Sequence, residues 1–312
     1  MDALSQLVRI VRLEAALDLR CQFAEGVTVD HGPASAHEIV FHVALSGNCL
    51  IDVEGMAPIE VRAGDFVAFP SGLAHRVRVG SQPDDSHRVA TTSNGPLTLR
   101  RSELGEIELD LLCGRFSYDS SAVDRVFETL PTVLHVSLSE VTSDTDLRLL
   151  VSLIRTEVEG DMPGAVAIVA SLCTALFTLA MRISSRRAGL SPCLLRLIGD
   201  ARLARAVQAI LQEPGRAWTL DQLAGLVAMS RATFARRFSE ASAMTPGGLL
   251  LQTRMSRAAE LLQRTKRGVA DIGTEVGYQS EAAFSKAFRR AMAVSPATFR
   301  RNGVDSERRR DE

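Results

Sequence analysis

Two stretches of the sequence place cationic side chains where they could bind a polyanion. SRATFARRFSEA begins at Ser230, and SEAAFSKAFRRA begins fifty positions later at Ser280. In both stretches phenylalanine follows the serine after four and after eight residues, with short or cationic residues between. Small residues let a helix approach a DNA groove closely, and Arg or Lys can then reach guanine edges or phosphates. The chemistry that this spacing predicts is recognition of nucleic acid.

The residues outside the phenylalanine face are the candidate DNA contacts. They are Arg231, Ala232, Thr233, Arg236 and Arg237 in the first copy, and Ser280, Glu281, Ala282, Ser285, Lys286 and Arg289 in the second. For any one arginine alone, a solvated surface position is the competing interpretation. The four phenylalanines are expected in the core, because residues four apart share one side of a helix.

The residues before each stretch predict a first helix, so that each copy is a helix, a tight turn and a second helix. Thr219 and Gln222 form a capping box that begins the first helix of copy one. Leu220, Leu223 and Val227 then recur on one face. Ser230 is a good N-cap for the second helix.

The second copy repeats this order after a long spacer. Val269, Ile272 and Val276 form the first face, and a turn at 277–279 is one residue longer than in copy one. Between the copies, TPGGLLLQTRMSRAAELLQ starts with Thr245 as N-cap and predicts one continuous helix. A rigid spacer could hold two recognition helices about 34 Å apart, the distance between successive major grooves on one face of a duplex.

These segments resemble a known family of bacterial regulators. SRATFARRF, RMSRAAELL and VADIGTEVGYQSEAAFSKAFRRAMAVSPATFRR are similar to the DNA-binding domain of the AraC/XylS family over about residues 200–301. The resemblance implies an all-α domain with two helix-turn-helix units that binds double-stranded promoter DNA, with SPATFRR as the final helix. It also implies recruitment of RNA polymerase.

The charge of the chain is unevenly distributed. The 312 residues are 46% hydrophobic, which is enough for a folded protein of two domains. Residues 195–312 hold 20 Lys and Arg against 12 Asp and Glu, whereas residues 1–194 hold 16 against 25. A basic module joined to an acidic one is typical of a polyanion-binding unit attached to a unit with another task.

The cysteines and the leader region favour the cytoplasm. Cys21, Cys49, Cys113, Cys173 and Cys193 are odd in number, and no C-x2-C pair occurs among them. This pattern argues against a disulfide framework or a zinc finger. The amphipathic opening segment is not typical of a signal peptide.

One apolar segment raises the possibility of a membrane. Residues 162–181 are uncharged over 20 positions, long enough to span a bilayer. The segment is rich in Ala, Ser and Thr, and we interpret it as a buried or dimer-forming helix. A membrane-tethered regulator is the alternative.

The first half of the chain has a β pattern. Short apolar runs separated by Gly, Pro or acidic turns follow Ile39 and predict a small antiparallel barrel or sandwich. GDFVAFPSGLAH, from Gly64 to His75, fits G-x5-P-x-G-x2-H and resembles the second sequence motif of cupin barrels. The resemblance places the His75 imidazole in the barrel interior, where we expect it to line an effector pocket.

A metal site is not expected from the histidines. Metal-binding cupins add two histidines and a glutamate from a first motif, H-x-H followed by E. Here His37 and His42 are five apart on a strand and face opposite sides, so the donors for a transition metal are missing. We therefore expect no metal, no cofactor and no enzymatic activity. A metal-dependent cupin enzyme fused to a DNA-binding domain is the alternative function.

The opening MDALSQL with Cys21 resembles a branch of the family that responds to reactive chlorine species. In that branch a cysteine near the N-terminus is oxidised and pairs with a second one, which would fall slightly before Cys113, where this chain has Asp110. The resemblance implies that Cys21 is the sensing residue. Cys113 is favoured as its partner over Cys49, Cys173 or Cys193. The sensing thiolate is expected to be exposed, and Arg20 next to Cys21 or Arg115 near Cys113 could lower the thiol pKa.

The sequence as a whole predicts an α+β protein. We expect a cupin-like sensor and dimerisation domain at 1–190, a linker at 191–199, an AraC-type DNA-binding domain at 200–301, and a disordered charged tail at 302–312. The predicted function is a cytoplasmic, homodimeric transcription regulator, an activator, controlled by a small effector or by an oxidant.

Overall fold

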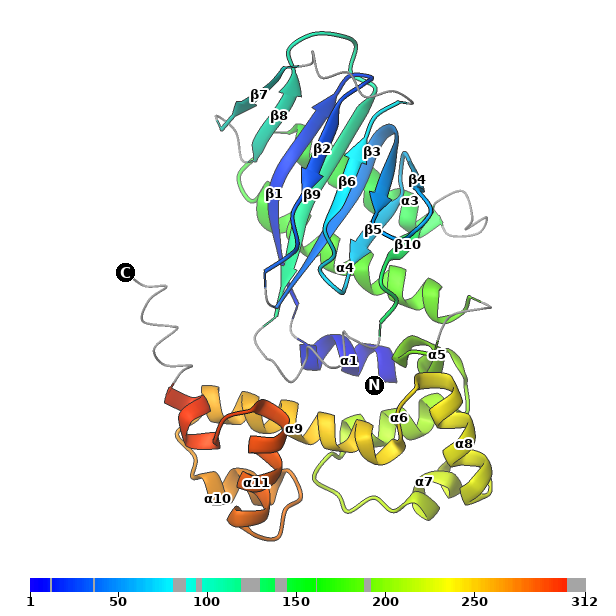
Figure 1. Cartoon of the computed structure of the whole chain (residues 1–312), viewed down its shortest axis with the longest axis vertical. Coiled ribbons are helices and arrows are strands. Elements are labelled where there is room, and N and C mark those ends of the chain that lie inside the picture. Colours follow the sequence, from blue (N-terminus) through cyan, green and yellow to red (C-terminus); the bar gives the residue numbers. More distant parts are fainter. Residues whose placement is uncertain are drawn as a thin grey trace. The chain divides into compact units, whose positions relative to one another are not determined.

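The computed structural model describes residues 1–312 apart from 12, 36, 81–87, 94–96, 119–129, 138–144, 161, 188–191 and 302–312. These residues form two compact units (Figure 1). Among the described residues, those within 13–118 and 131–187 form the sheet unit, and those within 1–11, 130 and 192–301 form the helical unit. The predicted tail at 302–312 lies outside the described residues.

The sheet unit is built on a ten-stranded curled sheet. Its longest path runs in the order β10-β5-β3-β9-β1-β8-β7, with β2, β4 and β6 attached through β3. The strands are β1 (Glu14–Phe23), β2 (Thr28–His31), β3 (Glu38–Val53), β4 (Ile59–Arg62), β5 (Phe66–Phe69), β6 (His75–Arg78), β7 (Val89–Thr92), β8 (Thr98–Ser102), β9 (Leu109–Ser117) and β10 (Leu134–Val136). The predicted cupin-like architecture is confirmed, although β1 and β8 pair in parallel rather than antiparallel.

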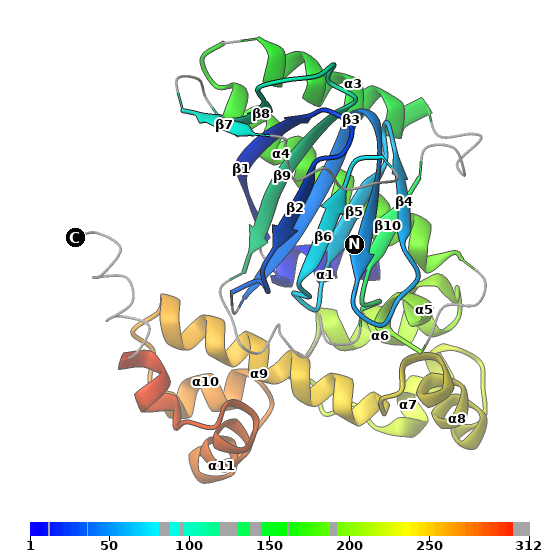
Figure 2. The same cartoon turned by 45° about the horizontal axis from the view of Figure 1, so that its top comes forward.

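Strand β3 produces the curl of the sheet. Its first half pairs with β5 and β9, and its second half pairs with β4 and β6 (Figure 2). The register against β9 shifts between Ala44 and Ser46, and Gly47 follows with a φ of 78°. A Cβ on Gly47 would lie 1.6 Å from the carbonyl oxygen of Glu108, so only glycine fits this bend.

Two helices cover one face of the sheet (Figure 1). They are α3 (Thr145–Glu159) and α4 (Ala165–Ser185). Ala165, Val169, Cys173 and Phe177, four residues apart, are buried on one side of α4, and Phe177 contacts Phe116 of β9 with ring centroids 4.9 Å apart. By length and composition α4 could also cross a membrane. Its packing against β1, β5 and β10 agrees with the interpretation as a helix of the folded core.

The helical unit contains the basic half of the chain. Its helices are α1 (Ala3–Val11), α5 (Leu194–Gly199), α6 (Leu203–Gln212), α7 (Leu220–Leu226), α8 (Arg231–Ser242), α9 (Pro246–Arg264), α10 (Val269–Glu275) and α11 (Glu281–Met292), and residues 296–301 are also helical. The helix at 296–301 lies where the resemblance placed the final one.

Two boundaries differ from the sequence-based ones. Most of the expected linker at 191–199 is helix α5, because Leu194, Leu195 and Leu197 are buried against α6 and α8. The N-terminal α1, expected in the first domain, packs instead on α6 within the helical unit. Leu4, Leu7 and Val11 of α1 are buried, which explains why the opening segment is amphipathic.

Candidate functional site

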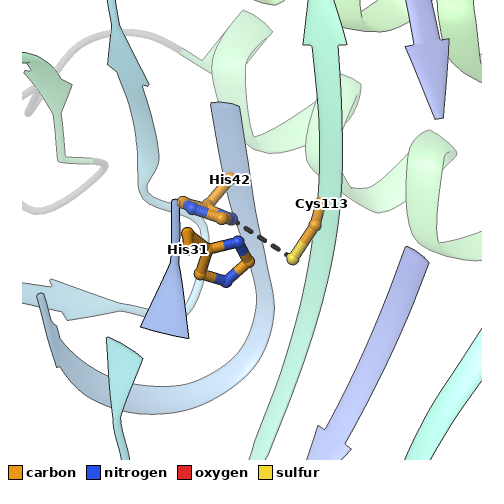
Figure 3. Close-up of side chains that lie close together, drawn as sticks. All are labelled: His31, His42 and Cys113. Carbon is orange, nitrogen blue, oxygen red and sulfur yellow. Dashed lines mark hydrogen bonds between the residues drawn. The ribbon is translucent and has the colours of Figure 1, made fainter. Parts of the chain in front are cut away.

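Histidines and cysteines converge inside the curled sheet, and all are buried except the half-buried His31. His31 at the end of β2 lies opposite His75 at the start of β6, and His42 of β3 lies opposite Cys113 of β9. Because β3 belongs to both parts of the sheet, the curl brings these two cross-strand pairs together. Figure 3 shows His31, His42 and Cys113 pointing toward one another. Cys21 of β1 completes the group, which we call the His/Cys cluster.

A chain of short contacts runs through the His/Cys cluster. The Nδ1 atom of His42 lies 3.2 Å from the Sγ of Cys113, and its Nε2 lies 2.7 Å from the Nε2 of His75. The Sγ atoms of Cys113 and Cys21 are 3.9 Å apart. The ring of His31 stacks on that of His75 and meets that of His42 edge-on, with centroids 4.9 and 4.8 Å apart.

The hydrogen-bond partners fix where the protons lie on two neutral rings. The Nδ1 of His75 lies 3.1 Å from the carbonyl oxygen of Leu73, which can only accept, so this nitrogen carries the proton. The Nε2 of His75 is then the acceptor for an N–H of His42. The remaining lone pair of His42, on Nδ1, consequently faces the Cys113 sulfur.

Burial keeps the imidazoles neutral. It lowers the pKa of His31 to about 4, lowers that of His75, and lowers that of the completely enclosed His42 well below the ordinary value. A neutral imidazole offers one nitrogen lone pair, which is what a hydrogen bond from a thiol or a bond to a metal ion requires.

The two thiols have opposite pKa shifts. The hydrogen bond from Cys113 lowers the pKa of Cys21 against the effect of burial, with a smaller contribution from Arg100. The same interaction and burial raise the pKa of Cys113. Burial raises the pKa of Cys49 and of Cys173 to about 12. Cys21 is therefore the more readily ionised thiol of the cluster.

The structure corrects the sequence-based picture of what surrounds Cys21. Arg20, its neighbour in sequence, forms an ion pair with Asp110 at 2.6 Å. Arg115 pairs with Asp18 and Glu38. Neither guanidinium is among the groups that shift the pKa of Cys21. Both Cys21 and Cys113 are also buried, whereas an exposed sensing thiolate was expected.

The expectation that the donors for a metal are missing is wrong. His37 does lie elsewhere, beside Tyr118 with ring centroids 5.6 Å apart. His31, which the sequence reasoning passed over, supplies the additional imidazole, and Cys113 supplies a thiol. The signal for His31 in the sequence was its position at the end of one strand, shortly before the next strand begins. Its partners are decided by non-local pairing, which the sequence pattern did not contain.

The helical unit places the predicted DNA contacts at its surface. Nine of the eleven are exposed, namely Arg231, Ala232, Arg236, Arg237, Ser280, Glu281, Ala282, Lys286 and Arg289, and the half-buried ones are Thr233 and Ser285. Phe234, Phe238, Phe284 and Phe288 are completely buried, as predicted. Ser280 also caps α11, accepting a hydrogen bond from the backbone N–H of Ala283.

The local geometry of the two helix-turn-helix units agrees with the sequence-based prediction. The capping box of Thr219 and Gln222 is present, Ser230 caps α8, and Thr245 with Pro246 begins α9. Each turn passes through a left-handed residue, Ala228 with φ 52° and Gly277 with φ 88°. With 19 residues, α9 is about 28 Å long, comparable with the roughly 34 Å of one DNA turn.

Comparison with known proteins defines the class. A family model described as a cupin matches residues 2–184, and one described as a helix-turn-helix domain matches residues 223–302. The chain therefore belongs to the AraC-type transcription regulators that carry an N-terminal cupin domain.

Full-length relatives agree with this class. An uncharacterized HTH-type transcriptional regulator of Haemophilus influenzae is 29% identical over 97% of this chain and 99% of its own. The HTH-type transcriptional regulator MtrA of Neisseria gonorrhoeae is 29% identical over 97% and 99%. The RCS-specific HTH-type transcriptional activator RclR of Escherichia coli K12 is 28% identical over 96% and 97%. All three are named as transcriptional regulators, which favours this function over a cupin enzyme.

Proposed function

We propose that this regulator activates transcription in response to an oxidant that joins Cys21 and Cys113. The observation that carries the proposal is the 3.9 Å separation of their sulfur atoms inside the sensor sheet. A relative named as an RCS-specific activator supports both the oxidant and the sign of regulation. We propose that this regulator acts in the cytoplasm, where it binds promoter DNA and recruits RNA polymerase.

The chemistry needs two thiols and one two-electron oxidant. The Cys21 thiolate attacks hypochlorous acid and becomes a sulfenic acid, releasing chloride. The Cys113 thiol then attacks that sulfur, and the disulfide forms as water leaves. Both cysteines lose one electron each, and the chlorine atom is reduced to chloride.

The disulfide would strain the reduced arrangement of the sheet. In the register of β1 and β9, Cys113 lies opposite Leu19 and Cys21 lies opposite Leu111, so the two cysteines are diagonal neighbours. Diagonal neighbours have Cα atoms about 7–8 Å apart, while a disulfide usually requires 4.4–6.8 Å. Oxidation would therefore draw β1 and β9 together, giving two arrangements of the sensor domain.

The test is a reporter fused to a promoter that the protein binds, with hypochlorous acid as the probe. Cys21→Ser and Cys113→Ser should each abolish induction and leave DNA binding by the reduced protein unchanged. Cys49→Ser is the matched control, because Cys49 is a buried thiol of the same hydrophobic core. Equal induction with and without Cys21 would refute the sensing role.

A homodimer completes the proposal, with α3 and α4 as the interface. The side chains of Leu149, Leu153, Val166 and Ile168 on these two packed helices are 61, 44, 41 and 42% exposed. A second copy of the chain would bury them, and two copies would bind paired half-sites. Leu149→Glu with Ile168→Glu should convert a dimer to a monomer in sedimentation measurements, and an unchanged mass would contradict this interface.

A further inference from the structure

We propose that the His/Cys cluster binds a zinc ion, with His31, His42, Cys113 and Cys21 as ligands. The ligand atoms of the first three lie within 4.8 Å of one another, and they come from three different strands. Figure 3 shows their side chains converging on one volume. Cys21 adds a second sulfur beside that of Cys113.

Two spacings of the donor atoms are close to those of a tetrahedral zinc site. With Zn–N near 2.0–2.1 Å and Zn–S near 2.3 Å, a tetrahedron places a nitrogen about 3.6 Å from a sulfur and two sulfurs about 3.8 Å apart. The His42 nitrogen lies 3.2 Å from the Cys113 sulfur, and the two sulfurs are 3.9 Å apart. These two spacings fit within a few tenths of an ångström, whereas the separations of up to 4.8 Å among the donor atoms of His31, His42 and Cys113 would have to shorten when an ion binds.

The hydrogen bonds behind His42 orient it as a ligand. Its Nδ1 lone pair is directed at the cluster because its Nε2–H donates to His75, which in turn donates to the carbonyl oxygen of Leu73. Histidine ligands in metalloproteins usually donate their other ring N–H in this way, which fixes the tautomer. His75 is thus a positioning residue. Phe69 holds its ring by stacking, with centroids 3.9 Å apart.

The chemistry of the donors selects the metal. The converging group in the described part of the chain contains imidazoles and a thiol but no carboxylate. Two thiolates with two imidazoles in a tetrahedron suit zinc, whereas Mg²⁺, Ca²⁺ and Mn²⁺ prefer oxygen ligands. The cluster also lies in an apolar core that includes Phe69, Val77 and Leu111, where a bound ion would be shielded from water.

Zinc and the disulfide would compete for the same sulfur atoms. A sulfur that joins a disulfide is no longer a thiolate ligand, so oxidation of Cys21 and Cys113 would expel the ion. This consequence rests on the proposed oxidant response, but the zinc site itself rests only on the geometry of the cluster. Metal content of the reduced protein and oxidant induction of the reporter are therefore separate measurements, and either can fail without the other.

The experiment uses the full chain, purified under reducing conditions without a histidine tag. Elemental analysis should find close to one zinc per chain in the wild type. Cys113→Ser and His31→Gln should lose it, with zinc affinity falling at least about 100-fold in competition with a chromophoric chelator. Cys49→Ser and His135→Gln should keep it, because Cys49, where β3 pairs with β4, is not one of the four proposed ligands and His135 binds Asp65 elsewhere.

Cobalt titration of the metal-free protein identifies the ligands. Co²⁺ should give the absorption of a thiolate-bound tetrahedral ion, and Cys113→Ser should weaken that absorption, because only the Cys21 sulfur then remains as a thiolate ligand. His75→Gln should keep the thiolate absorption and weaken affinity by about 10–100-fold, as expected for an outer hydrogen-bond partner. Wild-type zinc affinity no higher than that of both ligand variants would overturn the site. Binding of Cu⁺ in place of zinc under the same competition would overturn the choice of metal.

A folding control separates loss of a ligand from loss of structure. The metal-free wild type and the two ligand variants should have the same melting temperature, and zinc should raise only that of the wild type. A variant that melts lower than the metal-free wild type would be replaced by Cys21→Ser. If that variant also retained full zinc affinity, the proposed ligand set would be wrong.

Discussion

Cys113 of β9 lies opposite Leu19 of β1 rather than opposite Cys21. The sulfur atoms nevertheless approach to 3.9 Å, because the side chains of diagonal neighbours on one face of a sheet can lean toward each other. The cysteines are thus close enough to react while the backbone is set for the reduced state.

We expect oxidation to change the protection of β1 and β9 from hydrogen exchange. One equivalent of hypochlorous acid should produce a peptide linked through Cys21 and Cys113. The amides of Glu14–Phe23 should exchange faster, because pulling the two cysteines together distorts the hydrogen bonds between β1 and β9. Mass spectrometry reads both results. A linked peptide with unchanged exchange in β1 would show that the sheet absorbs the bond without rearranging.

Arg236→Ala and Lys286→Ala should weaken operator binding. Arg236 pairs at 3.0 Å with Glu240 on the surface, a contact that costs little to exchange for DNA. Loss of a phosphate contact should reduce the salt dependence of binding, and loss of a bidentate base contact should also cost about 1–3 kcal/mol of discrimination between base sequences. Arg216→Ala removes an equal charge from outside α8 and α11 and is the control. Wild-type footprints for both variants would exclude these recognition helices.

Phe234→Ala and Phe284→Ala should destabilise the helical unit. Both rings are completely buried, and removing such a ring costs about 3–5 kcal/mol of unfolding free energy. Thermal denaturation of the full chain followed by circular dichroism should show an earlier loss of helix. The measurement needs α1, because α1 packs on α6. Unchanged melting with lost DNA binding would mean that the rings face DNA.

Gly277→Ala should destabilise the second helix-turn-helix unit more than any exposed Gly→Ala change. The φ of 88° is unfavourable for alanine, and the added Cβ would lie 2.4 Å from the carbonyl oxygen of Gly215. The left-handed conformation alone costs about 1–2 kcal/mol. The equivalent Ala228 already bears this cost at φ 52°. Ala228→Gly would relieve it, but the greater conformational entropy of glycine in the unfolded chain opposes the gain, so the unfolding free energy should change little. Equal melting temperatures for the two variants would contradict this assignment of strain.

The helix-turn-helix units could be predicted because their signals are local. The caps at Thr219 and Ser230 and the phenylalanines four residues apart act within one or two turns of helix. The His/Cys cluster depends instead on β2 pairing with β6 and on the bend of β3 at Gly47. Alternation within a strand tells which face a histidine takes, but not which strand supplies its neighbour. Helix α5 was missed for a similar reason. Its three leucines are buried by packing against α8, which the local sequence pattern does not reveal.

The packing of α1 on α6 has a consequence for synthesis on the ribosome. Helix α1 ends at Val11 and its partner begins at Leu203, so nearly 200 residues are made between them. At about 5–20 residues per second this takes roughly 10–40 s, and domains generally fold as they emerge. During that interval the apolar face of α1 is not yet covered by α6, whereas the sheet that follows α1 in the chain can already form. The helical unit is therefore completed only after the sheet between α1 and α6 has been translated.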